Sequence, residues 1–313
     1  MMADEGLMTR HPSVSVVIAT YNRRHILEKV LRALANQTCP RDRYEVIVVD
    51  DGSTDDTGSM VSSMMQAYPN IRYERIPHSG AAAARNAGLR LARGELIIFV
   101  DSDLIVLEDF IEAHLREHTG RAGLIVHGPV IHTPDPDNLS GARPKLADIS
   151  HAFFATGNVS VSRAALFEAG LFDESFTEYG WEDLELGQRL RRLGLKVLRS
   201  NGPRGYHIKK SFSVADLPGT LDRERQRGRM ALVYYRKWPI FKVRMEILLT
   251  PAFFGLVNLL CLGNWPSRPG TVRFLRWLEG RGHRTIVAFL VKIMMYKVYA
   301  EGMKEGLMAN HII

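Results

Sequence analysis

The first 130 residues alternate between two hydrophobic patterns of different period. Short continuous apolar runs rich in β-branched residues, such as 14–20, are typical of strands buried on both faces of a sheet. Between them, apolar residues recur at helical spacing, as in 25–35. This pattern predicts strands at 14–20, 45–50, 71–76, 96–100 and 124–130, and helices at 25–35, 53–67 and 81–92.

Strands and helices that alternate at this interval predict an α/β fold. The expected architecture is a Rossmann-like, mostly parallel sheet with helices on both faces. In such sheets ligands bind beyond the carboxyl ends of the strands. Three predicted strands end in polar residues, which we expect to converge on one edge: Thr20-Tyr21-Asn22, Asp50-Asp51-Gly52 and Asp101-Ser102-Asp103.

The chain changes character after its first two thirds. Residues 132–150 are rich in Pro, Asp and Ser and are predicted to form a loop or lid. Because the pattern changes again near Phe212, we expect one domain over 1–211 and a helical C-terminal region over 212–313. Within the first domain, the remaining predicted elements are a strand at 159–162, helices at 164–169 and 182–193, and a strand at 196–199 before His207.

The C-terminal part of the chain is basic and has two apolar stretches, 245–262 and 285–300. Residues 189–313 hold 24 Lys and Arg against 7 Asp and Glu, a net of +17, whereas 1–188 hold 17 against 27, a net of −10. Both stretches contain polar or charged residues, unlike a clean span of about 20 apolar residues. They predict helices in an anionic membrane interface, at the cytoplasmic face. The alternatives are helices packed on the first domain, or an oligomerisation element in a homo-oligomer.

Three other classes of protein are disfavoured by the composition. Cys39 and Cys261 lie in unrelated contexts, so neither a zinc finger nor a disulfide framework is expected, and a reduced cytosolic setting is the default. The first ten residues lack the basic and apolar regions of a cleaved signal peptide. The apolar stretches in the basic tail suit lipid better than duplex DNA, so no nucleic-acid partner is expected.

The acidic segments at the strand ends are the first candidates for chemistry. Asp101 and Asp103 follow a buried strand and can both reach a divalent cation such as Mg²⁺ or Mn²⁺, which prefers oxygen ligands. The alternative is an Asp-rich turn. Asp51 can accept hydrogen bonds from a nucleobase or a ribose. An acidic first turn, with Ser53 or Thr54 as the N-cap of the helix at 53–67, requires the same residue types.

Four further residues have a functional and an ordinary interpretation. Arg85 can pair with phosphate or with carboxylates at the sheet edge, or can be a solvated helix residue. Asp183, beside Glu182, can be a general base or simply favour the start of a helix. His207 can supplement carboxylates at Mn²⁺, although a lone His is more often structural.

Five segments, in order, resemble the family 2 glycosyltransferases of GT-A fold, an inverting and metal-dependent group that includes chondroitin and polysaccharide polymerases. The resemblance extends from Val14 to His207, so 1–211 is expected to be the catalytic domain. The segments are VSVVIATYNR at 14–23, EVIVVDDGSTDDT at 45–57, AARNAGLRLARGELIIFVDSD at 83–103, FATGNVSVSR at 154–163 and FDESFTEYGWEDLELGQRLRRLG at 172–194.

The resemblance implies a role for each candidate. Nucleotide binding is implied for Thr20, Tyr21, Arg23, Asp51, Arg85, Asp101 and Ser102. The implied metal ligands are Asp103, Asp101 and His207, with Mn²⁺ or Mg²⁺ as cofactor. Gly157, Asn158 and Trp181 are expected at the donor and acceptor sugars. Asp183 would be the catalytic base, and Glu182 would orient hydroxyl groups.

The chain also departs from one branch of the family. It lacks the Gln-x-x-Arg-Trp signature and the membrane channel of processive cellulose-type synthases; residues 188–192 do not match that motif. We therefore expect one sugar to be transferred per encounter, to a glycan, lipid-linked or other hydroxyl acceptor. The resemblance favours a UDP-sugar donor and leaves GDP and dTDP open.

Three rival functions make different predictions. A dinucleotide-dependent oxidoreductase requires a G-x-G-x-x-G fingerprint after the first strand, where this chain has ATYNR. A nucleotidyltransferase shares paired carboxylates and metal, but it also predicts glycines near the first turn, which are absent. A nucleotide-binding, membrane-associated protein without transferase activity would not need Glu182 and Asp183.

Overall fold

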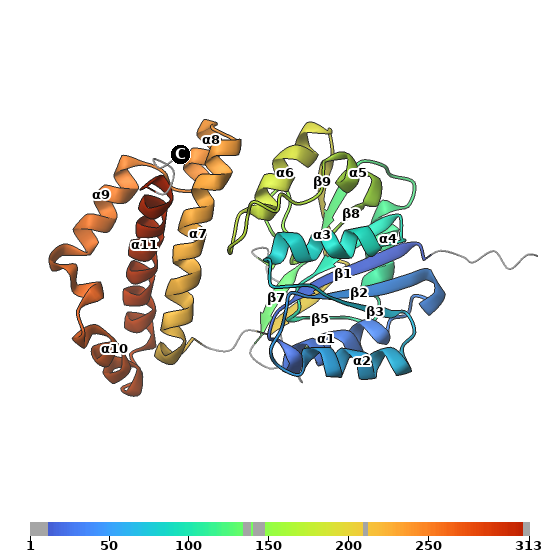
Figure 1. The fold of residues 1–313 in the computed structure, drawn as a ribbon, viewed down its shortest axis with the longest axis horizontal. Helices are drawn as coiled ribbons and strands as arrows, with labels where there is room; N and C mark the ends of the chain where they lie inside the picture. Colours follow the sequence, from blue (N-terminus) through green and yellow to red (C-terminus); the bar gives the residue numbers. More distant parts are fainter. Residues whose placement is uncertain (1–11, 134–138, 140–147, 209–211, 309–313) are drawn as a thin grey trace, which may run out of the picture. The chain divides into compact units, whose positions relative to one another are not determined.

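The protein is seen here in a computed structural model, which describes residues 12–133, 139, 148–208 and 212–308. It forms two compact units (Figure 1). The first comprises Met1–Glu174 and Asp183–Lys210, and the second comprises Ser175–Glu182 and Ser211–Ile313. The division after residue 210 lies next to the boundary expected from the sequence, but the short segment Ser175–Glu182 groups with the helical unit.

A seven-stranded sheet forms the centre of the first unit, in the order β3-β2-β1-β4-β8-β6-β9. All neighbouring pairs are parallel except those made by β8, which runs antiparallel between β4 and β6. The predicted, mostly parallel sheet is therefore confirmed. The strands are β1 (Val14–Thr20), β2 (Tyr44–Asp50), β3 (Ile71–Arg75), β4 (Leu96–Val100), β6 (Leu124–His127), β8 (Asn158–Ser162) and β9 (Lys196–Arg199).

A second sheet of three strands has the order β5-β10-β7. Its strands are β5 (Leu104–Val106), β7 (Val130–Thr133) and β10 (Gly205–Ile208). The strand predicted at 124–130 is therefore wrong as one element, because β6 ends before Gly128 and β7 begins after Pro129. A Cβ on Gly128 would lie 2.1 Å from the carbonyl oxygen of Pro203, so the chain passes too close to another segment there for any larger residue. The proline has no N–H with which to continue a ladder.

Helices cover both faces of the large sheet, as the sequence predicts (Figure 1). Successive strand residues point to opposite faces. Val16 and Ile18 of β1 accordingly lie in the apolar cluster of α1 and α2, whereas Val17 lies in that of α3 and α6. The helices of this unit are α1 (Arg24–Ala35), α2 (Thr57–Ala67), α3 (Ala81–Leu91), α4 (Phe110–His118), α5 (Arg163–Glu168) and α6 (Glu182–Arg192).

The second unit is helical, and its two longest helices, α7 and α11, lie side by side (Figure 1). Their close approach depends on glycine. A Cβ added to Gly228 of α7 would lie 2.2 Å from the carbonyl oxygen of Tyr299, and one added to Gly302 of α11 would lie 2.2 Å from that of Arg225. The helices are α7 (Leu217–Lys237), α8 (Phe241–Glu246), α9 (Pro251–Leu260), α10 (Gly270–Gly280) and α11 (Arg284–Met308).

The two apolar stretches of this unit differ in structure. Phe241–Leu260 has the length and composition of a membrane span, with a mean hydropathy of 1.5 and 17% of its most apolar window buried. It is divided into α8 and α9, however, by a turn in which Leu248 has a φ of 61°. The stretch at 285–300 is part of α11. That helix contributes to an apolar cluster with α10 through Leu275, Leu278, Val287, Val291 and Met294.

Candidate active site

The carboxyl ends of β1, β2 and β4 lie side by side in the sheet. Thr20 pairs with Asp50 across β1 and β2, and β1 pairs with β4 on its other side. The three polar segments that follow these strands therefore begin at one edge, as expected. Thr20 is buried, and its hydroxyl oxygen has no hydrogen-bond partner among the described residues. An orphaned polar atom of this kind marks a place where a ligand or water can bind.

The turns after β1 and β2 are locked together by side chains. The Asn22 side-chain oxygen accepts a hydrogen bond from the N–H of Thr54 at 2.7 Å, and the N–H of Asn22 donates to the Ser53 hydroxyl at 2.8 Å. Asp50 Oδ1 accepts from the N–H of Ser53 at 2.8 Å. These contacts hold the segment in a loop, so α2 begins only at Thr57. The prediction that Ser53 or Thr54 caps this helix is therefore wrong.

Asp51 is buried and organises the turn between β3 and α3. Its two carboxylate oxygens accept hydrogen bonds from the N–H groups of Ser79 at 2.7 Å and Gly80 at 3.0 Å. His78 Nδ1 lies 2.8 Å from Asp51 Oδ2. The exposed ring of Tyr21 stacks on the His78 ring, with centroids 4.4 Å apart. The stack and the carboxylate therefore meet at the sheet edge.

A cavity of about 430 Å³ opens beside this stack. It is lined by Gly52, Arg75, Ile76, Pro77 and His78. Arg75 also donates to the carbonyl oxygen of Ser53 at 3.0 Å, which fixes the guanidinium at the loop. The sequence did not single out Arg75 or His78. Their position at and just beyond the end of β3 is the signal that could have found them, because it places them on the same edge as Asp51.

Asp101 begins the turn after β4 and lies against Gly157. A Cβ on Gly157 would be 3.1 Å from Asp101 Oδ2, so glycine leaves room for this carboxylate. Burial raises the pKa of Asp101 above its ordinary value, opposed by the charge of Arg85 and reinforced by that of Asp103. Arg85 also lies over the Phe172 ring, 5.5 Å from its centroid. The structure thus brings Arg85 close to Asp101.

Asp103 connects three parts of the site. It forms an ion pair with Arg23, which follows β1, and its Oδ1 lies 3.0 Å from Nε2 of His207 in β10. Burial alone would raise the pKa of Asp103, but the hydrogen bond from His207 and the charges of His207 and Arg23 bring it below its ordinary value. Ser102, between the two aspartates, is half-buried. His132 of β7, which the sequence reasoning missed, lies with its Nδ1 3.1 Å from that of His207.

The donor set at this point fits a divalent cation. A carboxylate oxygen of Asp103 and an imidazole nitrogen of His207 face each other, and both are ligands that Mn²⁺ accepts. Contact with His132 directs Nε2 of His207 toward Asp103, as partners of metal-binding histidines often do. Residues 12–133, 139, 148–208 and 212–308 contain no group of three His, Cys, Asp or Glu arranged for a metal. Phosphate oxygens or water would have to complete the coordination.

Gly157 and Asn158 are separated in function by the structure. Asn158 is buried, and its Nδ2 donates to the carbonyl oxygens of Pro129 at 3.0 Å and Pro203 at 2.8 Å. Its Oδ1 lies 3.0 Å from Nε2 of His114. The side chain therefore holds β8 to the neighbouring loops. Gly157 is the member of the pair that lies against Asp101.

Asp183 lies in the first turn of α6, and its Oδ1 accepts a hydrogen bond from the N–H of Leu184 at 2.8 Å. The positive end of the helix dipole favours a carboxylate here. The same helix packs against the loop that leads to Gly157, because a Cβ on Gly187 would lie 3.1 Å from Cβ of Phe154. This packing fixes α6 relative to the loop that contacts Asp101.

The residues just before Asp183 are held within the helical unit. Trp181 has a φ of 77°, its Nε1 donates to the carbonyl oxygen of Arg227 at 2.8 Å, and its ring stacks on Tyr234 with centroids 5.9 Å apart. Glu178 binds the Arg229 guanidinium through two contacts of 2.8 and 2.9 Å. Glu182 is buried. Trp181, expected at a sugar, thus makes its described contacts with α7.

An ion-pair network joins this segment to both long helices. Arg229 lies 2.7 Å from Glu305 of α11, and Arg225 lies 2.9 Å from Glu301 and also pairs with Glu305. The hydrogen bond to Glu178 is the main cause that raises the pKa of Arg229, with Glu305 adding to it. The network fixes Glu178, five residues before Asp183.

Comparison with known proteins identifies relatives along much of the chain. Residues 15–174 match the family model described as "Glycosyl transferase family 2". The uncharacterized glycosyltransferase YfnE of Bacillus subtilis (strain 168) is 31% identical over 239 residues, which cover 58% of this chain and 61% of that protein. Validoxylamine A glucosyltransferase of Streptomyces hygroscopicus subsp. jinggangensis is 33% identical over 230 residues, covering 61% and 54%. This chain therefore spans only part of the length of these curated relatives.

The fold is also found among solved structures. The mannosyltransferase PcManGT from Pyrobaculum calidifontis, in complex with GDP-Man and Mn²⁺, matches with a TM-score of 0.62 at 18% identity, covering 96% of this chain and 88% of that one. The likeness shows a shared fold, the expected GT-A architecture. Since the family model matches more than half of its residues, this chain belongs to glycosyl transferase family 2.

Proposed function

We propose that this protein is an inverting, metal-dependent glycosyltransferase that moves a sugar from a nucleoside-diphosphate sugar to a hydroxyl group. The observation that carries the proposal is the meeting of Arg23, Asp103 and His207, from three different parts of the chain, at the carboxyl edge of the sheet. A guanidinium, a carboxylate and an imidazole at one point suit a diphosphate and its counter-cation.

The nucleoside part of the donor would bind where Tyr21 stacks on His78. A base can extend that stack, and the carboxylate of Asp51 can accept a hydrogen bond from the base or the ribose. The unpartnered hydroxyl of Thr20 lies at the same edge. UDP is the nucleotide that the family resemblance favours, and GDP, bound by the mannosyltransferase of similar fold, is the first alternative.

Asp103 and His207 would hold a Mn²⁺ or Mg²⁺ ion, with Asp101 beside them. When bound, the cation would neutralise charge on the diphosphate leaving group. The solved mannosyltransferase is a complex with Mn²⁺, which supports this assignment. Arg23 now pairs with Asp103, and in the loaded site its guanidinium would have phosphate oxygens as further partners.

Asp183 would act as the general base. Its carboxylate would take the proton of the acceptor hydroxyl while that oxygen attacks the anomeric carbon, and the bond from this carbon to the diphosphate would break with inversion. Glu182 would orient hydroxyl groups of the donor or acceptor. Gly157 would leave room for the donor sugar beside Asp101, and Trp181 would border the acceptor.

The acceptor would be a glycan, a lipid-linked saccharide or another hydroxyl compound, with one sugar added per encounter. The basic helical unit supports a peripheral location on an anionic membrane, at its cytoplasmic face. A homo-oligomer formed through this unit is a further possibility to test by solution mass.

A panel of UDP-, GDP- and dTDP-sugars, each with Mn²⁺ or Mg²⁺, tests the proposal. The measurement is release of nucleoside diphosphate in the presence of a mixture of saccharide and lipid-linked acceptors. We expect one donor to react, only with the cation present. No release from any donor, or release unaffected by removing the cation with a chelator, would contradict the proposal.

A further inference from the structure

Large apolar side chains are exposed on α10 and at the start of α11. Phe274 and Trp277 of α10 are 50% and 48% exposed, and Phe289 of α11 is 61% exposed. Phe274 and Trp277 are three residues apart on one helix face, and their rings stack with centroids 5.9 Å apart. Ile286, at 49%, is also exposed. An aromatic surface of this kind usually marks an interaction site.

The same surface is strongly basic. Residues 262–292 contain six Lys and Arg against a single acid, Glu279. That acid already accepts a hydrogen bond from the N–H of Val214 at 2.8 Å. Arg281 lies over the Trp277 ring, 4.4 Å from its centroid. The six basic residues, all exposed, are Arg268, Arg273, Arg276, Arg281, Arg284 and Lys292.

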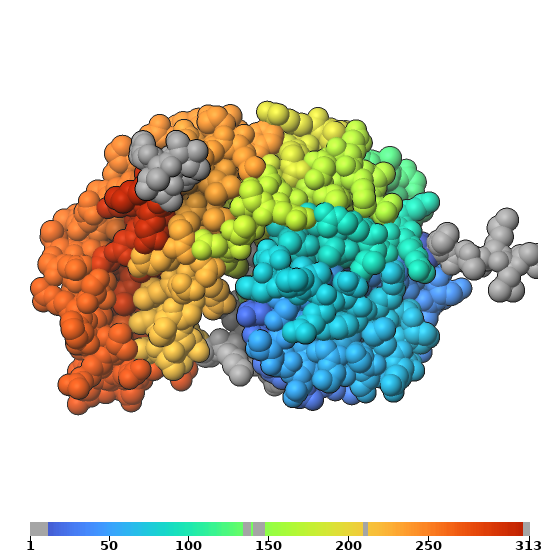
Figure 2. Space-filling model, in the orientation of Figure 1, coloured from blue at the N-terminus to red at the C-terminus, as the bar shows by residue number. Residues whose placement is uncertain are grey.

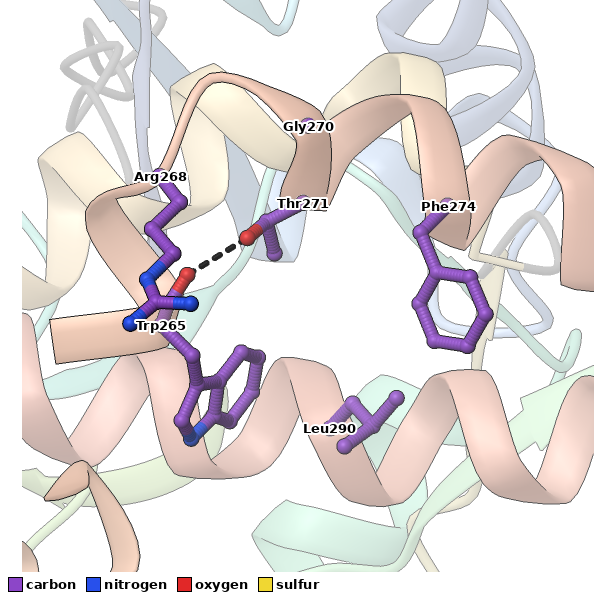
Figure 3. Close-up of a pocket in the computed structure, with 6 residues that line it drawn as sticks. All are labelled: Trp265, Arg268, Gly270, Thr271, Phe274 and Leu290. Carbon is purple, nitrogen blue, oxygen red and sulfur yellow. Dashed lines mark hydrogen bonds between the residues drawn. The ribbon is translucent and has the colours of Figure 1, made fainter. Parts of the chain in front are cut away.

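A cavity of about 470 Å³ lies between these helices. Figure 3 shows the rings of Trp265 and Phe274 and the side chain of Leu290 around it, with Arg268 beside Trp265. The polar groups of its wall have partners: the indole N–H of Trp265 donates to the carbonyl oxygen of Leu260 at 2.9 Å, and the Thr271 hydroxyl donates to that of Trp265. The cavity therefore presents mainly hydrocarbon surface, with one guanidinium at its edge.

We propose that this surface docks on an anionic phospholipid membrane. The aromatic side chains of α10 would enter the headgroup layer, the arginines would contact lipid phosphates, and the cavity would take part of one acyl chain. Residues of α9 and α10, orange in Figure 2, form part of the visible surface of the helical unit. The inference rests on the proposed function, since it would hold the enzyme where lipid-linked acceptors occur.

Charge complementarity favours a membrane over a second copy of the chain. A second copy would bring the same excess of arginine to the contact, and like charges repel. An anionic leaflet supplies the opposite charge to every basic side chain, and Trp and Arg side chains suit its interface because each has an apolar body and a polar end. The turn at Leu248 that separates α8 from α9 is also compatible with helices that lie along an interface.

Sedimentation of the full chain with vesicles tests the inference. The vesicles are phosphatidylcholine alone, or phosphatidylcholine mixed with phosphatidylglycerol. We expect binding only to the mixed vesicles, and less of it at high ionic strength. Because each basic side chain contributes roughly fivefold at an anionic surface, Arg273→Gln with Arg276→Gln should lower the partition coefficient at least about tenfold. Phe274→Ala with Trp277→Ala should lower it by a similar factor.

The matched control is Arg93→Gln with Lys196→Gln, two exposed basic residues of the first unit, which should bind the vesicles as the wild type does. Release of nucleoside diphosphate from a soluble donor should stay unchanged in every variant, which also shows that each folds. Absent binding at low ionic strength, or equal loss in the control, would overturn the inference while leaving the transferase proposal intact. A change of solution mass in the α10 variants without vesicles would overturn it in favour of self-association.

Discussion

The carboxyl edge of the sheet and the surface of α10 both concentrate charge, but they hold it in different ways. At the sheet edge, Asp51 accepts two backbone hydrogen bonds, and Asp103 contacts both Arg23 and His207. On α10, Arg273 and Arg276 are exposed and take part in no ion pair within the described residues. A site fixed in advance depends strongly on each group, whereas an exposed surface acts through the sum of small contributions.

The largest effect is expected from Asp183→Asn, which removes the proposed base and keeps the size of the side chain. General-base catalysis contributes about 10²- to 10⁴-fold, so kcat should fall by about a thousandfold, with donor affinity nearly unchanged. Steady-state kinetics and calorimetric titration of the donor measure the two quantities.

The control for this variant is Asp42→Asn, an exposed acid beside the start of β2, at the opposite edge of the sheet. It should retain full activity. A kcat for Asp183→Asn within about tenfold of the wild type would remove Asp183 from the role of base.

The second effect concerns the stability of the helical unit. Gly228→Ala places a methyl group 2.2 Å from the carbonyl oxygen of Tyr299, so α7 and α11 must separate. Overpacking of this kind costs about 1–3 kcal/mol. Thermal unfolding should show the loss, with Gly219→Ala as the control in the same helix, because no atom lies within 4 Å of the added carbon there. Equal stability of the two variants would show that α7 and α11 do not need the glycine contact.

The smallest effect is expected at the ion pair of Glu178 and Arg229, whose side chains are partly exposed and therefore screened. A double-mutant cycle with Glu178→Gln and Arg229→Gln should give a coupling of about 1 kcal/mol in urea unfolding. Because Glu178 lies five residues before Asp183, we also expect kcat to fall several-fold with unchanged donor affinity. A cycle without coupling would mean that the pair does not hold this segment.

The sequence predicted the parts of the fold that depend on local pattern. Buried strands such as 14–20 and 45–50 and the helix at 25–35 have a clear period, and the structure places β1, β2 and α1 there. The start of α2 was missed because Asn22, more than thirty residues away, binds Thr54. The division of the strand at 124–130 likewise depends on Pro203, which no local pattern connects with Gly128.

The candidate site shows the same limit. Asp101 and Asp103 could be found because they directly follow a strong strand signal. His78 and His132 could not, since a lone histidine has no periodicity, and its proximity to Asp51 or His207 exists only in the folded chain. The attachment of Trp181 to α7 depends on Arg227, 46 residues further along the chain. The loop or lid predicted at 132–150 lies largely outside the described residues.

The central claim is that the carboxyl edge of the sheet binds a nucleoside diphosphate together with a divalent cation. Calorimetric titration of UDP and GDP, with and without Mn²⁺, into the wild type and Asp103→Ala tests it most directly. The account predicts that Mn²⁺ increases the affinity of the wild type for one nucleotide at least about tenfold, and that Asp103→Ala loses this increase. An equal response to Mn²⁺ in both proteins, or no binding of either nucleotide to the wild type, would contradict it.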